Sequence, residues 1–279
     1  ARWIGKSVGD QFQPEDRRPG GNPKRLVLLD PDALTAKLVR FVLNEAGHDV
    51  DWLPEAGNAL PMIAERETDA VLLEAELPGV DAFALCRELR GYRYNGPLLF
   101  LTARRETRDK LQAFASGADD YIVEPFDPAE LVARIDAVAR RYRRADYQSL
   151  GSILTVGDAE LTIGELSYRV GDSEKVLLTP TEMRLLECLM RNAGITISRD
   201  TLIERTWGYD FIGESNRVDV YVARLRRKIE RNPAHPEYLH TVRGLGYVFR
   251  PPVQPAGRRS LSTPRPWDRG VPAAVGVGV

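Results

Sequence analysis

The chain has 279 residues, of which 43% are hydrophobic and 28% charged, and its formal net charge is −1. This length suffices for two domains, and the apolar content is that of a globular protein with sizeable cores. The two cysteines, Cys86 and Cys188, lie in helical patterns without metal-ligand neighbours, which argues against a disulfide framework. Because the chain has neither a run of about 18 apolar residues nor a secretory signal, we expect a cytoplasmic protein that does not bind membranes.

Residues 1–23 are rich in Gly, Pro and charged residues, which predicts a disordered arm. Residues 24–143 alternate short apolar runs with stretches of 3.6-residue periodicity, as in a parallel sheet whose strands are buried on both faces. Strands are predicted at 26–29, 49–53, 70–73, 98–101 and 121–123, and helices at 33–46, 57–66, 81–90, 106–116 and 127–143. This alternation predicts an α/β fold with a doubly wound sheet, in which function gathers at the carboxyl ends of the strands.

A second domain is predicted at 153–251, after a polar linker at 144–152. Residues 153–178 contain four short alternating runs broken by Gly-containing turns, which indicates a small antiparallel sheet. Helices are predicted at 180–191, 199–206 and 215–231, followed by a hairpin at 238–250. The Pro- and Gly-rich residues 252–279 are predicted to be a disordered tail.

The helix predicted from Ser215 has two distinct faces. One face carries an apolar core stripe at helical spacing, formed by Val218, Val222, Leu225 and Ile229. A second face, about a quarter turn away, carries Arg217, Tyr221, Arg224 and Lys228. Residues 215–250 hold eight Lys or Arg residues against three acidic ones. Such a helix fits the major groove of DNA, although a basic face on its own is more often simply solvated.

Four motifs cover the segment 178–250: LTPTEMRLLECLMRNAG, SRDTLIERTWGYD, NRVDVYVARLRRKIE and HTVRGLGYVF. This segment closely resembles the winged helix-turn-helix DNA-binding domain of OmpR/PhoB-family response regulators. The resemblance implies that the helix from Ser215 is the recognition helix for double-stranded promoter DNA. The residues expected at base edges or in the groove are Asn216, Arg217, Tyr221 and Arg224.

Further contacts follow from the same resemblance. Arg226, Arg227 and Lys228 are expected to contact phosphates or to be structural, and Arg243 begins the wing. Asp219 and Trp207 are assigned to structure. Residues 208–214 resemble the loop that touches RNA polymerase in the family.

Residues 25–143 resemble the receiver domain of the same family, through LVLLDPD, DAVLLEAELPG, LFLTA and GADDYIVEPFDPAELVARIDAV. A working receiver needs an Asp nucleophile, two acidic groups that hold Mg²⁺, and a Lys that neutralises the phosphoryl oxygens. This chain departs at three of these positions, with Glu74 for the nucleophile, Pro31 for the second acid and Glu124 for the Lys. The residues that remain in the pocket are Asp30, Asp32 and Thr102. We therefore expect an atypical receiver that is not phosphorylated.

Glu74 has two interpretations. It mimics a phosphorylated Asp, or it belongs to a silent pocket in which Asp30, Glu74 and Glu124 repel one another. The first is weakened because Glu124 replaces the Lys that would pair with it. In the second, the repulsion raises at least one pKa or recruits a cation.

In the family, two receivers pair around a two-fold axis through their last helix–strand–helix layer. The matching positions are Lys110, Asp120, Glu130, Arg134 and Arg141. Pairs of Lys110 with Glu130 and of Asp120 with Arg141 are expected in a homodimer, although such charges are also found simply solvated. Thr102 and Tyr121 match the family's switch positions.

The leading hypothesis is a sequence-specific transcription regulator that acts independently of phosphorylation and dimerises through its receiver. One alternative is a regulator whose small-molecule effector binds the receiver, and another is a conventional phosphorylated response regulator. We expect no enzymatic activity, cofactor or metal, because phosphate loops, nucleophile elbows and His/Cys clusters are absent from the sequence.

Overall fold

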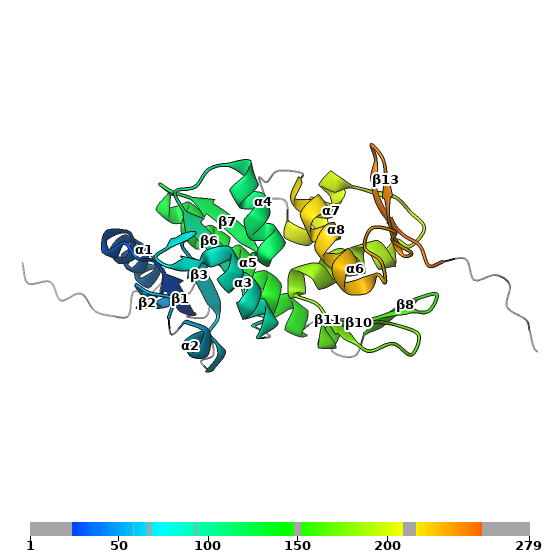
Figure 1. Cartoon of the computed structure of the whole chain (residues 1–279), viewed down its shortest axis with the longest axis horizontal. Coiled ribbons are helices and arrows are strands. Elements are labelled where there is room, and N and C mark those ends of the chain that lie inside the picture. The colour runs from blue at the N-terminus through cyan, green and yellow to red at the C-terminus, as the bar shows by residue number, and fades with distance from the viewer. Residues whose placement is uncertain are drawn as a thin grey trace, which may run out of the picture.

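The computed structural model describes residues 24–57, 59–65, 68–92, 94–147, 152–208 and 216–252. The predicted arm at 1–23 and almost all of the predicted tail lie outside these residues. The described residues form two domains that meet along one interface (Figure 1). Among them, no helix is both long and apolar enough to span a bilayer.

The N-terminal domain is a five-stranded parallel sheet with strand order β2-β1-β3-β6-β7. Its strands are β1 (Arg25–Leu29), β2 (Asp49–Leu53), β3 (Ala70–Leu73), β6 (Leu98–Thr102) and β7 (Asp120–Val123). Its helices are α1 (Ala33–Glu45), α2 (Ala59–Glu65), α3 (Ala82–Gly91), α4 (Thr107–Ser116) and α5 (Pro128–Tyr147). This arrangement confirms the predicted α/β fold with a doubly wound sheet.

Both faces of this sheet are buried, as the apolar runs predicted. Successive side chains of a strand point to opposite faces. In β1, Val27 and Leu29 therefore join one core cluster, while Leu26 and Leu28 join the other. The helices on the two faces complete these clusters.

Two features differ from the predictions. Helix α5 continues to Tyr147, through part of the predicted linker at 144–152, because the helix-favouring residues Arg143, Arg144 and Ala145 extend it. A hairpin of β4 (Glu76–Leu77) and β5 (Val80–Asp81) follows β3 and was not predicted. Two-residue strands are too short to produce a periodic signal.

The C-terminal domain begins with an antiparallel sheet in the order β11-β10-β9-β8. Its strands are β8 (Ile153–Val156), β9 (Ala159–Thr162), β10 (Ser167–Val170) and β11 (Val176–Leu177), and the short helix η1 (Ile163–Glu165) joins β9 to β10. The helices α6 (Pro180–Arg191), α7 (Arg199–Trp207) and α8 (Asn216–Ile229) follow. The strands β12 (Ile197–Ser198), β13 (Leu239–Val242) and β14 (Gly246–Phe249) form a second antiparallel sheet.

Helix α6 begins at a capping box. The Thr179 hydroxyl accepts from the backbone N–H of Glu182, and the Glu182 carboxylate accepts from the N–H of Thr179. Its Pro180 fits the first turn, where a missing N–H costs nothing. Helix α6 then packs on α5 of the N-terminal domain.

The two domains meet where α8 packs on α4 and α6 packs on α5. Figure 1 shows α4 and α8 side by side at the middle of the molecule. The DNA-binding helix expected from the sequence is thus an interdomain helix in this structure.

Replacing Phe100 with Ala tests the core on which the sheet depends. Phe100 is fully buried and stacks on Phe83 and Tyr121, with ring centroids 5.2 Å and 6.1 Å apart. We expect the free energy of unfolding to fall by about 3–5 kcal/mol, measured by urea denaturation. The matched control is Phe41→Ala at a side chain that is 65% exposed, where we expect a change within about 0.5 kcal/mol. Equal losses in the two variants would contradict this account of the core.

Candidate nucleic-acid interface and degenerate phosphorylation pocket

The face of α8 that carries Arg217, Tyr221 and Arg224, here called the donor face, is turned toward the N-terminal domain. Arg217, Tyr221 and Arg224 lie at helical spacing on one side of α8, and all three are buried. The core stripe predicted at Val218, Val222 and Leu225 packs inside the C-terminal domain, as the periodicity indicated.

Arg217 forms the ion pair of this interface. Its Nη2 lies 2.8 Å from Oδ1 of Asp120, at the start of β7, and both side chains are nearly inaccessible to solvent. The guanidinium also lies over the ring of Phe114 in α4, with 3.8 Å from Cζ to the ring centroid. Arg217 therefore reaches both β7 and α4.

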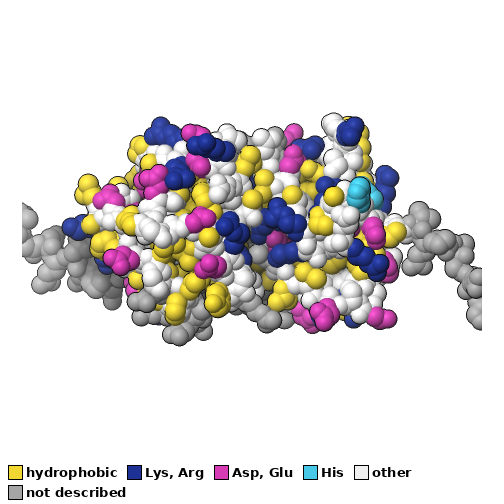
Figure 2. All heavy atoms as spheres, viewed as in Figure 1, with side chains coloured by type: hydrophobic (Ala, Val, Ile, Leu, Met, Phe, Trp, Pro, Cys, Tyr) yellow, Lys and Arg dark blue, Asp and Glu magenta, His cyan; other side chains and the backbone are white. Residues whose placement is uncertain are grey.

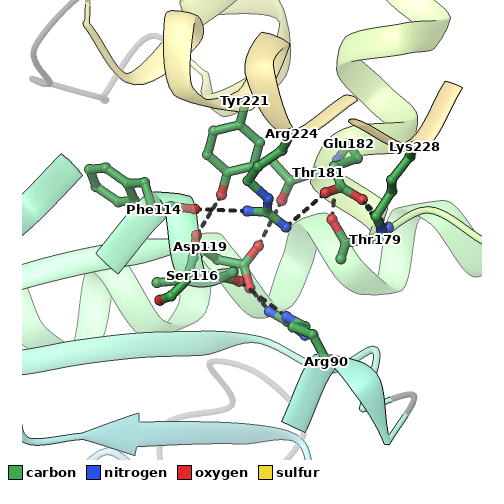
Figure 3. A network of polar contacts seen from close by, with 12 residues as sticks. Arg90, Phe114, Ser116, Asp119, Thr179, Thr181, Glu182, Tyr221, Arg224 and Lys228 are labelled. Carbon is green, nitrogen blue, oxygen red and sulfur yellow. Dashed lines mark hydrogen bonds and ion pairs between the residues drawn. The ribbon is translucent and has the colours of Figure 1, made fainter. Parts of the chain in front are cut away.

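Tyr221 and Arg224 donate to backbone carbonyls of the N-terminal domain. The Tyr221 hydroxyl donates to the Ala118 carbonyl oxygen at 2.7 Å, and Nη1 of Arg224 donates to the Phe114 carbonyl oxygen at 3.1 Å. Figure 3 shows both side chains extending from α8 to these carbonyls. Tyr221 is also packed edge-on against Trp207, whose assignment to structure agrees with its buried position.

Arg224 is also held from within its own domain. Its Nη2 lies 2.8 Å from the fully buried carboxylate of Glu182, and Nζ of Lys228 lies 2.7 Å from the same group. Burial opposes ionisation of Glu182, but Arg224 and Lys228 outweigh it and lower the pKa of Glu182 to about 2. A charged Glu182 thus fixes the positions of two basic side chains of α8.

The sequence pattern is compatible with a DNA groove or bulk water around this helix face, and the structure has a third environment for it. Arg217, Tyr221 and Arg224 contact the N-terminal domain, so none of them is available to DNA in this arrangement. The physical reason is that the N-terminal domain offers the acceptors these donors need once they are buried.

The other predicted DNA-binding residues fall into two groups. Asn216, Arg227 and Arg243 are exposed. In contrast, Arg226 donates to the Leu239 carbonyl at 2.9 Å and 2.7 Å, and Lys228 donates to the Leu177 carbonyl as well as to Glu182. On the face of the molecule drawn in Figure 2, Lys and Arg side chains gather near the middle, where the two domains meet. Residues 209–214, in the predicted polymerase-contacting loop, lie outside the described residues.

Asp119 joins the two domains close to this interface. Its buried carboxylate accepts from Nη2 of Arg90 at 2.7 Å and from the Tyr142 hydroxyl at 2.6 Å. It also accepts from the backbone N–H of Leu98 at 3.0 Å and from the Thr181 hydroxyl of α6 at 2.9 Å. Figure 3 shows Asp119 between Arg90 and the C-terminal domain.

The predicted pocket residues gather at the carboxyl ends of β1, β3, β6 and β7. Asp30 is buried and accepts from the backbone N–H of Asp32 at 2.8 Å. Glu74 accepts from the Thr102 hydroxyl at 2.6 Å and from the N–H of Glu76 at 3.0 Å. Pro31 and Asp32 are exposed, and Asp32 caps α1. The carboxylates of Asp30 and Glu74 thus accept hydrogen bonds from backbone amides and from the Thr102 hydroxyl, which are neutral donors.

Burial and mutual repulsion shift the protonation of this pocket. Burial, with Glu74, Asp30 and Asp32 nearby, raises the pKa of Glu124 to about 7. Burial is also the main cause that raises the pKa values of Glu74 and Asp30. One carboxyl oxygen of Glu124 is buried without a hydrogen-bond partner among the described residues. Within those residues, no three His, Cys, Asp or Glu side chains are grouped so that they could hold a metal ion.

The residues at the switch positions lie apart. Thr102 donates to Glu74, whereas the Tyr121 hydroxyl donates to the Arg104 carbonyl at 3.0 Å. Tyr121 is buried, and its ring stacks on that of Phe100 in β6. The loop that starts α4 thereby connects the pocket to the helix that contacts α8.

The predicted dimer face is partly used within the chain. Arg134 lies 3.2 Å from Asp120 and 2.7 Å from Glu130, and Asp120 also pairs with Arg217. The predicted pairs of Asp120 with Arg141 and of Lys110 with Glu130 would form between two copies, so they stay predictions, and the Arg141 side chain lies outside the described part of the chain. Asp120 is thus engaged by α8 in the single chain.

Sequence reasoning missed Asp119, Thr181 and Arg90 as residues of the interface. Thr181 was part of a predicted helix start, and Asp119 part of a family motif, but 62 positions separate them. Contacts between separate domains leave no periodic signal in the sequence.

Comparisons with known proteins identify the two domains. Residues 26–136 match the response regulator receiver domain, and residues 173–249 match the C-terminal domain of transcriptional regulatory proteins. Two solved variants of RitR, with one cysteine replaced by Asp or by Ser, are 28% identical to the chain. They cover 82% of this chain and 99% of their own, with TM-scores of 0.67 and 0.68.

The response regulator DrrB of Thermotoga maritima, described as an OmpR/PhoB homologue, is 26% identical, with a TM-score of 0.41 over 82% of this chain and 100% of its own. The two matched domains, in this order, make the chain a response regulator of the OmpR/PhoB type, with a receiver domain followed by a DNA-binding transcriptional regulatory domain.

Proposed function

We propose that the chain is a sequence-specific transcription regulator whose receiver works without phosphorylation and pairs with a second receiver. The observation that carries the first part is the match of residues 173–249 to a transcriptional regulatory domain. The observation that carries the second is the pocket of three carboxylates, Asp30, Glu74 and Glu124, in place of a phosphorylation site.

DNA recognition uses α8 and the wing. Asn216 at the start of α8 is exposed and has the amide that reads adenine edges in a major groove. The exposed Arg227 and Arg243 supply phosphate contacts on the helix and on the β13–β14 hairpin. Arg217, Tyr221 and Arg224 supply further donors once α8 is free of the receiver. Arg226 and Lys228 serve the domain itself, because their donors are used by Leu239, Leu177 and Glu182.

Phosphate transfer is disfavoured by charge as well as by geometry. A phosphodonor would bring negative oxygens to Glu74 while Glu124 stands where a cation is needed, and the two carboxylates already repel each other. The extra methylene of Glu74 also shifts the carboxylate from the position of an Asp nucleophile. We therefore place the control of this regulator outside phosphorylation. The proposed partners are promoter DNA, RNA polymerase and a second copy of the chain.

A small-molecule effector is a second candidate. The described surface holds a hollow of about 610 Å³ beside the pocket, lined by the β4–β5 hairpin, Arg104 and Gln112. Arg104 pairs with Glu76 at 3.1 Å and with Asp109 of α4 at 3.6 Å. A ligand that attracts Arg104 would therefore act on α4, which is in contact with α8.

Removing Arg227 or Arg243 should weaken DNA binding without changing its sequence preference. Because both are proposed phosphate contacts, each Ala variant should reduce the slope of log K against log salt by about one. The measurement is fluorescence anisotropy with a duplex selected from random sequence, at several salt concentrations. The control is Lys37→Ala on the exposed face of α1. A slope equal to that of the Lys37→Ala control would contradict the proposed phosphate contacts of Arg227 and Arg243.

Incubation with acetyl phosphate and Mg²⁺ should leave the intact mass of the chain unchanged, because neither a nucleophilic Asp nor the neutralising Lys is present. The matched variant combines Pro31→Asp, Glu74→Asp and Glu124→Lys, which rebuilds the functional set of a receiver, and it should gain one phosphoryl group. A gain in the unmodified chain would overturn phosphorylation independence.

Glu124→Gln should make the chain more stable at pH 8, relative to the unmodified chain, than at pH 5. The folded chain keeps the Glu124 proton up to about pH 7, whereas the unfolded chain releases it near 4.5. The free energy of unfolding of the unmodified chain therefore falls as pH rises through this window and then levels off. The expected difference is about 1–2 kcal/mol after allowance for solvent screening.

Urea unfolding at the two pH values measures this effect. Glu45→Gln, at an exposed carboxylate of α1, is the control and should shift stability equally at both pH values. The same flat response in Glu124→Gln would contradict the raised pKa of Glu124.

A further inference from the structure

The C-terminal domain has a cavity at the carboxyl end of α8. Its volume is about 440 Å³, which is within the range of small-molecule binding sites. The residues around it come from the β8–β9 turn, β10, the end of α8 and the start of β13, so the cavity is formed without the receiver. The lining includes two tyrosines and four carboxylates: Tyr168, Tyr238, Asp158, Glu174, Glu230 and Glu237.

Tyr168, at the floor of this cavity, carries a polar group that no described residue uses. The side chain is only 2% exposed, and its hydroxyl has no hydrogen-bond partner in the part of the chain that the structure describes. Burial raises the pKa of this hydroxyl, and the nearby Tyr238, Glu230 and Asp158 raise it further. The hydroxyl therefore keeps its proton and lies beside three other residues of the lining. A buried hydroxyl without a partner costs free energy, which a ligand that hydrogen-bonds to it recovers.

The cavity has an excess of negative charge. Two of its basic side chains are engaged by carboxylates outside the lining, because Arg169 pairs with Glu160 at 2.8 Å and Lys228 pairs with Glu182 at 2.7 Å. Arg231 is the remaining basic residue of the described lining, against four acidic ones. The carboxyl end of α8 adds the negative end of its helix dipole. The cavity is therefore suited to a cation.

The lining favours a planar cation with several donors. The Asp158 carboxylate accepts from the Tyr238 hydroxyl at 2.9 Å, so a carboxylate and a phenol ring lie next to each other. A guanidinium donates two parallel hydrogen bonds to a carboxylate, lies favourably over an aromatic ring, and has further N–H groups for the Tyr168 oxygen. We propose that this cavity binds a guanidinium group, with Asp158 as its counter-ion and Tyr168 as a hydrogen-bond partner.

Two sources can supply this group: a small molecule in solution or an arginine of the chain itself. Pro252 lines the cavity, and Pro251 lies so close to Gly157 in the β8–β9 turn that a Cβ there would be 2.7 Å from the Pro251 Cβ. Arg258 and Arg259 follow in the sequence. Six residues extend to about 20 Å, which is enough chain to return an arginine to the cavity.

Calorimetric titration of the full-length chain with agmatine, a small guanidinium compound, tests the site at about 0.15 M salt, which screens weak surface binding. We expect Asp158→Asn to lower the affinity by about 10- to 100-fold, because a charge-assisted hydrogen bond is lost while the amide oxygen still accepts from Tyr238. The matched control is Asp200→Asn, at an exposed residue of α7 outside the cavity, which should leave the affinity unchanged.

Tyr168→Phe removes only the unpartnered hydroxyl. We expect the affinity for agmatine to fall by about two- to tenfold, while the melting temperature without agmatine stays the same or rises. A lower melting temperature with unchanged affinity would assign the hydroxyl to structure and overturn its role in binding. Putrescine, which has an ammonium in place of the guanidinium, should bind more weakly than agmatine. Equal affinity for the two compounds would overturn the assignment to a guanidinium.

The double variant Arg258→Ala with Arg259→Ala distinguishes the two sources. If an arginine of the chain occupies the cavity, this variant binds agmatine more tightly than the unmodified chain, and its amides at 228–231 and 237–239 exchange faster without agmatine. If the ligand is a small molecule, affinity and exchange equal those of the unmodified chain, and either result supports the site. The proposal is overturned if agmatine binds neither protein, or if it binds Asp158→Asn and Asp200→Asn equally well.

Discussion

The buried carboxylate of Asp119 is the constraint on which the arrangement of the two domains depends. It takes hydrogen bonds from α3, β6, α5 and α6, so it joins the receiver internally and ties it to the C-terminal domain. A buried carboxylate is costly unless its partners are in place, and Arg90 and Tyr142 supply them within the receiver. Thr181 then meets a preformed acceptor, which fixes α6 and, through the shared core of its domain, the direction of α8.

The interface combines apolar packing, in which Phe114 and Tyr221 belong to one core cluster, with buried donors and acceptors. Its ion pair, Arg217 with Asp120, is deeply buried, and such pairs specify an arrangement better than they stabilise it.

The receiver pocket and the interface lie at opposite ends of β7. Glu124 follows the carboxyl end of this strand, and Asp119 and Asp120 lie at its beginning. Helix α4 follows Arg104, whose carbonyl accepts from the Tyr121 hydroxyl, and its Phe114 carbonyl accepts from Arg224 of α8. Helix α4 is thus in contact both with β7 and with α8.

Residue patterns determined the elements, the two folds and the positions of the pocket residues. Apolar runs and helical spacing are local, and the carboxyl ends of parallel strands meet at one edge, so Asp30, Glu74 and Glu124 could be grouped in advance. The donor face of α8 was also visible at Arg217, Tyr221 and Arg224, but its neighbour was not. That neighbour depended on how two separately folded domains pack, which is decided by matching a few buried donors to acceptors far away in the chain. Only the tertiary structure could bring Thr181 to Asp119, because no periodicity or spacing connects residues of different domains.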